Sequence, residues 1–367
     1  MIRIAQPIIE DEEIKAVNEV LKSGILAQGS KTAQLEEDFA RYCGTKYAVA
    51  VNSGTAAIHT ALYAAGVREG DEVITVPFSF IATINPILMV GAKPVLVDIN
   101  PSTFCMDAAK LEQAITSKTK AIIPVHLYGQ TADQDEIIKI AKRHNLKVIE
   151  DSCQAIGAEY KGKKAGSLGD MGCFSLYATK NIMCGEGGMI TTDNEEYAIL
   201  ARRFRQHGMS APYMYEELGY NYRITDLQSC IAIEQLKKVD KFTKSRQDNA
   251  RALTDGLSGI EGLVLPEIAS DRNHVFHQYT IRVTESFSLS RDGFIEELHN
   301  REIGAGAYYP RALHSYPHIS KLGYKLGDFP EAEKAASEVV SLPVHPNVSF
   351  DDTQMIISTI KEIANAK

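Results

Sequence analysis

Residues 150–189 read EDSCQAIGAEYKGKKAGSLGDMGCFSLYATKNIMCGEGGM. Asp151 follows an apolar strand pattern, and Gln154 comes three residues later. A second strand pattern, at 173–177, is followed by Lys180 and then by a cluster of glycines. In an open α/β sheet, ligands bind beyond the carboxyl ends of the strands. The stretch therefore predicts a ligand site where these two strands end.

Predicted strands alternate with predicted helices on the amino-terminal side of this stretch. Two amphipathic helices come first. The apolar stripe of one, at Ile14, Val17 and Leu21, ends at the expected C-cap Gly24, and that of the other, at Leu35, Phe39 and Tyr42, stops at Gly44. Short, nearly continuous apolar strands are then expected at 47–51, 72–76, 94–98, 120–125 and 147–150, with helices at 54–65, 81–90 and 133–144. This alternation predicts the α/β class, with a mostly parallel central sheet covered by helices on both faces.

The alternation weakens after about residue 240. The pattern then predicts an alternating strand at 278–283 and helices at 241–257, 291–300 and 350–366. This mixture indicates a smaller C-terminal α+β domain. The predicted organisation is a large domain at 1–240 and a small domain at 241–367.

The composition limits the class of protein. The chain has 367 residues, 44% of them hydrophobic and 23% charged, which is ordinary for a globular protein. Its net charge of -8 and the lack of a long basic run argue against a nucleic-acid partner. No stretch has the length of a membrane span or the form of a signal peptide. The six scattered cysteines and the absence of paired metal ligands predict a cytoplasmic protein without a metal.

A possible phosphate site lies at residues 52–57, which read NSGTAA. They stand where a predicted strand ends and a predicted helix begins. Backbone N–H groups at a helix start are free to bind a phosphate, Gly54 permits a close approach and Thr55 adds a hydroxyl. A Ser or Thr N-cap with a tight turn is the simpler interpretation of this motif alone.

The side chains in the opening stretch suit pyridoxal 5'-phosphate (PLP). The Asp151 carboxylate can pair with a protonated pyridine nitrogen, and Gln154 can donate to the phenolic oxygen of the same ring. Lys180 supplies the amine that such an enzyme needs, and Ser175 can contact the phosphate. Taken singly, Asp151 could cap a turn and Lys180 could be a surface charge. Their order, each after a strand, favours the cofactor site.

The chain resembles the DegT family of PLP-dependent sugar aminotransferases, which has the aspartate-aminotransferase type I fold. The resemblance extends over nearly the whole chain. It rests on an ordered series of motifs: SG at 23–24, LE at 35–36, NSGT at 52–55, PFSFIAT at 77–83, PVHLYG at 124–129, EDSCQA at 150–155, Lys180 with its glycines, HG at 207–208 and GYNYR at 219–223.

This resemblance implies roles for individual residues. Lys180 would be the catalytic lysine that binds PLP covalently. The other cofactor-binding residues would be Gly54, Thr55 and Ser175 at the phosphate, Phe80 stacked on the ring, Asp151, Gln154, and Asn221 reaching the phosphate of the neighbouring subunit. A homodimer with shared active sites is therefore expected. Tyr309 and His314 match the segment on the sugar side, although Ala312 stands where the family more often has Pro. Arg223 and the basic run at 202–205 are candidates to contact a nucleotide diphosphate.

The implied reaction is transfer of an amino group from L-glutamate, by way of pyridoxamine phosphate, to a nucleotide-linked keto-sugar. The sequence Gly-Glu-Gly-Gly at 185–188 favours amination at C4. The alternatives are amination of a free cyclic ketone such as a keto-inositol, a PLP-dependent sugar dehydratase, and a non-catalytic PLP-binding regulator. Related dehydratases carry histidine in place of Lys180, which argues against that alternative. The nucleotide, the sugar and the product stereochemistry stay open.

A near match to a phosphate-binding P-loop at 157–164 has a different explanation. The segment reads GAEYKGKK and lacks the final Ser or Thr that would bind Mg²⁺. A hairpin that turns at Lys161 and Gly162 is the preferred interpretation.

Overall fold

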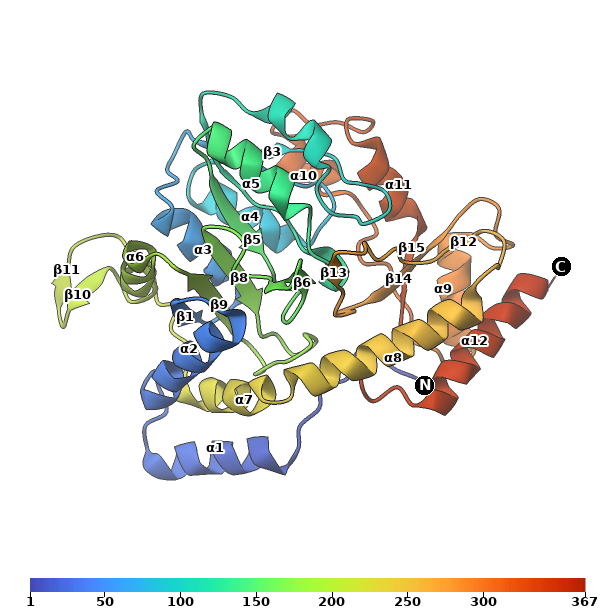
Figure 1. The fold of residues 1–367 in the computed structure, drawn as a ribbon, viewed down its shortest axis with the longest axis horizontal. Helices are drawn as coiled ribbons and strands as arrows, with labels where there is room; N and C mark the ends of the chain where they lie inside the picture. The colour runs from blue at the N-terminus through green and yellow to red at the C-terminus, as the bar shows by residue number, and fades with distance from the viewer. Residues whose placement is uncertain (367) are drawn as a thin grey trace.

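A seven-stranded sheet forms the centre of the protein, in a computed structural model that describes residues 1–366 (Figure 1). The strand order is β1-β9-β8-β5-β4-β2-β3. The strands are β1 (Tyr47–Val51), β2 (Glu72–Thr75), β3 (Lys93–Leu96), β4 (Thr119–Ile122), β5 (Lys147–Asp151), β8 (Met171–Ser175) and β9 (Gly188–Thr192). Only β9 pairs antiparallel, with both β1 and β8. The mostly parallel sheet predicted from the sequence is confirmed.

Helices cover both faces of this sheet, as predicted. Successive side chains of a strand point to opposite faces, so Val49 and Ile149 enter one hydrophobic core while Ala50 and Val148 enter cores on the other side. The first face is covered by α3 (Gly54–Ala64), α4 (Asn85–Met89) and α6 (Glu195–Arg205). The second is covered by α2 (Ser30–Cys43), α5 (Gln134–Arg143) and α7 (Asp226–Leu236).

The C-terminal part contains a small antiparallel sheet with helices, which confirms the predicted α+β region. Its strands are β12 (Leu263–Val264), β14 (Tyr279–Val283) and β15 (Val339–Leu342), and its helices are α8 (Val239–Leu257), α9 (Arg291–Asn300) and α12 (Phe350–Asn365). In contrast, α11 (Pro330–Glu338) packs into the core of the large sheet, where Ala332 and Ala335 join Ile122. The boundary predicted at residues 240 and 241 falls in the first turn of α8 and stays a prediction.

The remaining elements lie around these two parts. They are α1 (Asp11–Ser23), α10 (Pro317–Ser320), the strands β6 (Glu159–Tyr160), β7 (Lys163–Lys164) and β13 (Arg272–Asn273), the hairpin β10 (Met209–Ala211) and β11 (Met214–Tyr215), and the 3₁₀ turns at Ile81–Thr83, Ala108–Lys110, Glu112–Ala114, Leu127–Gly129 and Leu313–Ser315. The antiparallel pair β6–β7 confirms the hairpin predicted in place of a P-loop. Within residues 1–366, no helix has both the length and the apolar character needed to cross a membrane.

The single helix predicted at 81–90 is wrong. The structure has a 3₁₀ turn at Ile81–Thr83 and the separate short helix α4. Pro86 explains the break, because it has no N–H to donate back along a continuous helix and instead occupies the first turn of α4.

Helix α1 forms where it was expected and ends at Gly24, but it buries a different face. Ile14 and Leu21 are exposed, at 53% and 52%, while Glu13 and Val20 are buried. The Glu13 carboxylate accepts hydrogen bonds from Lys238 and from the Gln235 amide at 2.7–2.9 Å. A salt bridge and hydrogen bonds therefore attach α1 to the body of the protein, and part of its apolar stripe remains at the surface.

Candidate active site

The carboxylate of Asp151 is held at the carboxyl end of β5. Asp151 is 5% exposed, and its Oδ2 accepts a 2.7 Å hydrogen bond from the Thr83 hydroxyl. Ser79 in turn contacts the Thr83 hydroxyl at 2.8 Å, and the Cys153 N–H donates to Asp151 Oδ1 at 3.2 Å. The Asp151 side chain therefore has one orientation fixed from two sides. Thr83 and Ser79 were missed as site residues, although both lie in the PFSFIAT motif.

Gln154 joins this site through both ends of its amide. Its Oε1 accepts the Tyr128 N–H at 2.9 Å, and its Nε2 donates to the Tyr309 hydroxyl at 3.0 Å. The Tyr309 ring lies 5.9 Å from the ring of Phe80, measured between centroids. Burial raises the pKa of the Tyr309 hydroxyl, so it stays protonated. The structure thus brings together Phe80, Gln154 and Tyr309, which are distant in sequence.

Lys180 follows β8, the strand beside β5 in the sheet. Burial lowers the pKa of the Lys180 amine, while the neighbouring Cys153 and Asp151 act in the opposite direction. A lowered pKa increases the fraction of neutral amine, which is the nucleophilic form. Lys180 is therefore an amine suited to covalent chemistry.

The start of α3 packs closely against the end of β8. The Ser53 hydroxyl accepts the Ala56 N–H, as expected of an N-cap, and leaves the N–H groups of Gly54 and Thr55 at the helix start. A side chain at Gly54 would collide with its surroundings, since an added Cβ would lie 2.9 Å from both the Ser175 Cβ and the Cys153 Sγ. The N-cap and the phosphate-site interpretations of this motif are thus compatible.

These groups fit PLP. A buried carboxylate, an amine of lowered pKa and a helix start with free N–H groups match the ring nitrogen, the aldehyde and the phosphate, respectively. Phe80, whose side chain is 54% exposed, offers an aromatic face beside Tyr309.

Three further predicted site residues form no hydrogen bond or ion pair with this group within residues 1–366. His314 is fully buried, and its Nε2 pairs with Glu333 Oε1 at 2.9 Å beside the ring of Phe329. Asn221 is exposed and forms a β-bridge with Gln206. Arg223 is half-buried. The roles of all three stay predictions.

Arg223 lines a cavity of about 770 Å³ between α6 and the β10–β11 hairpin. The cavity takes its positive charge and aromatic character also from Arg202, Arg203, Arg205, Tyr213 and Tyr215, and His207 lines it as well. The three arginines of α6 pair with Glu36, Glu216 or Glu217. Among residues 1–366, Arg223 has no ion-pair partner, so the cavity retains positive charge. Arg205 is buried, whereas Arg202 and Arg203 are half-buried.

The fold and this site define the class of PLP-dependent aminotransferases. More specifically, the chain belongs to the DegT/DnrJ/EryC1/StrS aminotransferase family, whose model matches residues 7–361. It is therefore a sugar aminotransferase by family, which confirms the resemblance found in the sequence.

Similar proteins support this assignment. GDP-perosamine synthase from Caulobacter vibrioides is 40% identical over 366 residues, covering 99% of this chain and 98% of that protein. A protein of Geobacillus stearothermophilus named pleiotropic regulatory protein is 44% identical over 357 residues, covering 96% and 95%. The structure of Spr1654 from Streptococcus pneumoniae in its PLP form superposes with a TM-score of 0.94 at 30% identity, covering 99% and 98%.

Proposed function

We propose that this protein transfers an amino group from L-glutamate to a nucleotide-linked keto-sugar, with PLP bound at Lys180. The observation that carries the proposal is the Lys180 amine, whose pKa is lowered by burial beside the buried Asp151 carboxylate. The similarity to GDP-perosamine synthase supports a nucleotide-linked substrate, and the glycine turn at 185–188 favours a 4-keto-sugar.

Each residue near Lys180 has a task in this reaction. Bound PLP would supply an electron sink that stabilises negative charge on the substrate carbon. Asp151, held by Thr83, keeps its carboxylate at the pyridine nitrogen, and Gln154 donates to the ring oxygen. Lys180 would hold the cofactor covalently, and its amine would carry the proton that moves between carbon atoms in both halves of the reaction.

The phosphate and the flat face of the cofactor have their own partners. Gly54 and Thr55 bind the phosphate through the start of α3, and Ser175 adds a hydroxyl. Phe80 covers one face of the ring.

The substrate side rests on residues around the same site. Tyr309, whose hydroxyl accepts a hydrogen bond from Gln154, faces the sugar. His314 supports the same segment from within the core. Arg223 binds a diphosphate, a role supported by the positive charge of the cavity it lines.

A cytoplasmic homodimer is the proposed form. Asn221 is exposed next to the β10–β11 hairpin, which projects from the body in Figure 1 and could meet a second chain. The exposed apolar side chains Ile14, Leu21 and Ile25 on and after α1 form a surface that a second copy would cover. Asn221 would then complete the phosphate site of the partner.

One alternative gains support from the comparisons. The similarity to a protein named pleiotropic regulatory protein favours a PLP-binding regulator as the second candidate. The intact set Lys180, Asp151 and Gln154 favours the enzyme, since a regulator has no need of all three. A free cyclic ketone as substrate and a dehydratase are the remaining alternatives, and Lys180 argues against the dehydratase.

Glutamate is expected to change the absorbance of the PLP-bound protein, and one nucleotide-linked keto-sugar is expected to restore it. The measurement is a spectral titration with glutamate, followed by a screen of 3-keto and 4-keto sugars linked to different nucleotides, with products identified by mass. D-Glutamate serves as a control. No spectral change would support the regulator or the dehydratase, and amination of a keto-inositol alone would support the free ketone.

Mixed dimers are expected to recover activity if the site is shared. Lys180→Ala and Asn221→Ala are each expected to be nearly inactive. If the two variants are mixed after dissociation, random pairing makes about half of the dimers mixed, and each mixed dimer has one intact site of two. The mixture should therefore recover up to about a quarter of the wild-type rate. Mixing Lys180→Ala with Asp151→Asn subunits is the control and should restore none. The absence of recovery in the first mixture would place Asn221 in its own subunit's site or outside it.

A further inference from the structure

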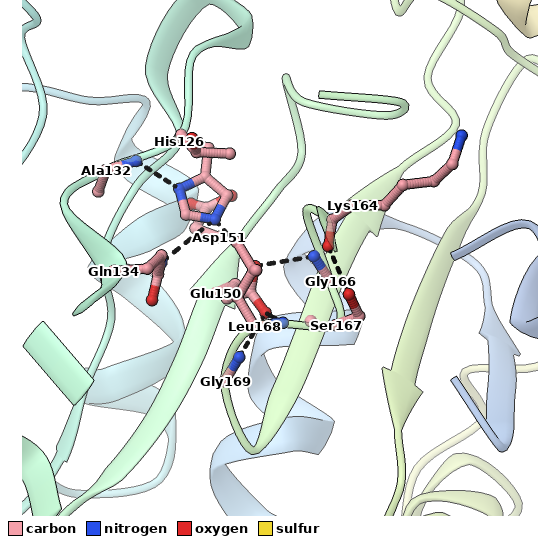
Figure 2. A network of polar contacts seen from close by, with 12 residues as sticks. His126, Ala132, Gln134, Glu150, Asp151, Lys164, Gly166, Ser167, Leu168 and Gly169 are labelled. Atoms are coloured by element: carbon pink, nitrogen blue, oxygen red, sulfur yellow. Dashed lines mark hydrogen bonds and ion pairs between the residues drawn. The ribbon is translucent and has the colours of Figure 1, made fainter. Parts of the chain in front are cut away.

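Glu150 is a fully buried carboxylate directly before Asp151, and no role has been assigned to it (Figure 2). Its Oε1 accepts the N–H groups of Leu168 and Gly169, both at 2.8 Å. Its Oε2 accepts the Gly166 N–H at 2.7 Å and contacts His126 Nε2 at 2.9 Å. Four donors thus surround the carboxylate, which fills the positions that an ionised carboxylate offers.

His126, also fully buried, is the one side chain among these four donors. Its Nδ1 accepts the Ala132 N–H at 3.2 Å, so its proton lies on Nε2 and is donated to Glu150. The Gln134 amide lies 3.4 Å from the same ring nitrogen, and its Oε1 has no hydrogen-bond partner within residues 1–366. Turning that amide over would give the ring N–H a second acceptor. Both ring nitrogens of His126 are thereby engaged, which fixes the ring.

The backbone of His126 binds the other carboxylate residue. The His126 N–H donates to the Asp151 carbonyl at 3.0 Å, and the Asp151 N–H donates to the Pro124 carbonyl at 2.9 Å. Side chains alternate along β5, so Glu150 points to the face where His126 lies and Asp151 points to the face of α3. One residue, His126, therefore contacts both members of the pair, one through its ring and one through its backbone.

We propose that His126 is a positioning residue for Asp151, acting through Glu150. The ring bond to Glu150 and the backbone bond to Asp151 hold the end of β5 against the segment after β4, so that the Asp151 carboxylate meets the pyridine nitrogen without reorganising. The inference rests on PLP as the cofactor of the proposed function.

Two substitutions separate this role from simple packing. His126→Gln can place an amide nitrogen where Nε2 lies and keep the bond to Glu150, whereas the shorter side chain of His126→Asn cannot reach it. We expect His126→Asn to weaken PLP binding about tenfold or more and to move the NMR shift of the pyridine nitrogen, in PLP labelled there, toward the unprotonated form. His126→Gln should stay within about threefold of wild type.

The matched control is a second histidine–carboxylate pair. His144 contacts Glu112 at 3.0 Å on the surface, and His144→Asn should change neither measurement. A folded His126→Asn with wild-type affinity and nitrogen shift would overturn the proposal, as would a change in melting temperature alone. If that variant does not fold, Gln134→Leu decides. Its pyridine-nitrogen shift is expected to move toward the unprotonated form, and a wild-type shift would overturn the proposal. No sugar is needed, so a wrong substrate assignment leaves this test intact.

Discussion

Lys180→Ala is expected to lower the rate of amino transfer by at least about 10⁴-fold while the fold and the cofactor site persist. The variant removes both the amine that binds PLP and the group that moves the proton, and acid–base catalysis alone contributes about 10²–10⁴. Burial lowers the pKa of this amine. The rate should be measured in single turnovers, with glutamate added to PLP-loaded protein.

A covalent probe makes this expectation sharper. Borohydride reduction of the wild-type protein should attach the cofactor to the peptide that contains Lys180, as read by mass, and Lys180→Ala should show no such adduct. Lys164→Ala is the matched control, since the Lys164 amine lies 3.8 Å from the centre of the Tyr42 ring, on the β6–β7 hairpin. Substantial turnover in Lys180→Ala, or an adduct at another lysine, would contradict the assignment.

Asp151→Asn is expected to lower the rate by about 10²–10³-fold, the usual loss when one preorganised electrostatic partner is removed from an active site. An amide in this place cannot supply the negative charge that keeps the pyridine nitrogen protonated. Thr83→Val should give a smaller loss of about tenfold, because it leaves the charge and removes only the 2.7 Å bond that orients it.

The control for this substitution is another carboxylate of equal burial. Asp98, like Asp151, is 5% exposed, and it accepts N–H groups of Ile99, Glu331 and Ala332 away from the site. Asp98→Asn should lower the melting temperature but leave the rate per folded molecule near wild type. A wild-type rate in PLP-loaded Asp151→Asn would show that this carboxylate does not act on the cofactor.

Much of the fold could be predicted because its strands bury both faces. Strands such as β5 and β8 are short and apolar, and a helix or loop with turn residues follows each one, so their positions stand out in the sequence. Asp151 and Lys180 could be placed at one edge of the sheet for the same reason. Recognition of the family motifs supplied the roles that the pattern alone left open.

Other parts of the site depend on contacts between distant segments. Thr83 meets Asp151 across 68 positions and Gln154 meets Tyr309 across 155, and no local pattern encodes either contact. In helix α1 the local pattern predicts the wrong buried face. The apolar stripe that includes Ile14 was expected to be buried, whereas Lys238 and Gln235 attach the helix through the Glu13 carboxylate. Helical periodicity reports an apolar face but not what covers it.

The sequence by itself determined the α/β sheet and the family and supplied the candidates for the reactive lysine and carboxylate, because strand periodicity and local motifs are properties of neighbouring residues. Only the tertiary structure decided how that carboxylate is held. Thr83 orients Asp151 from one face, and the buried pair of His126 and Glu150 fixes the strand from the other. Hydrogen bonds in a buried site depend on geometry within a few tenths of an ångström, and the packing of distant segments sets that geometry.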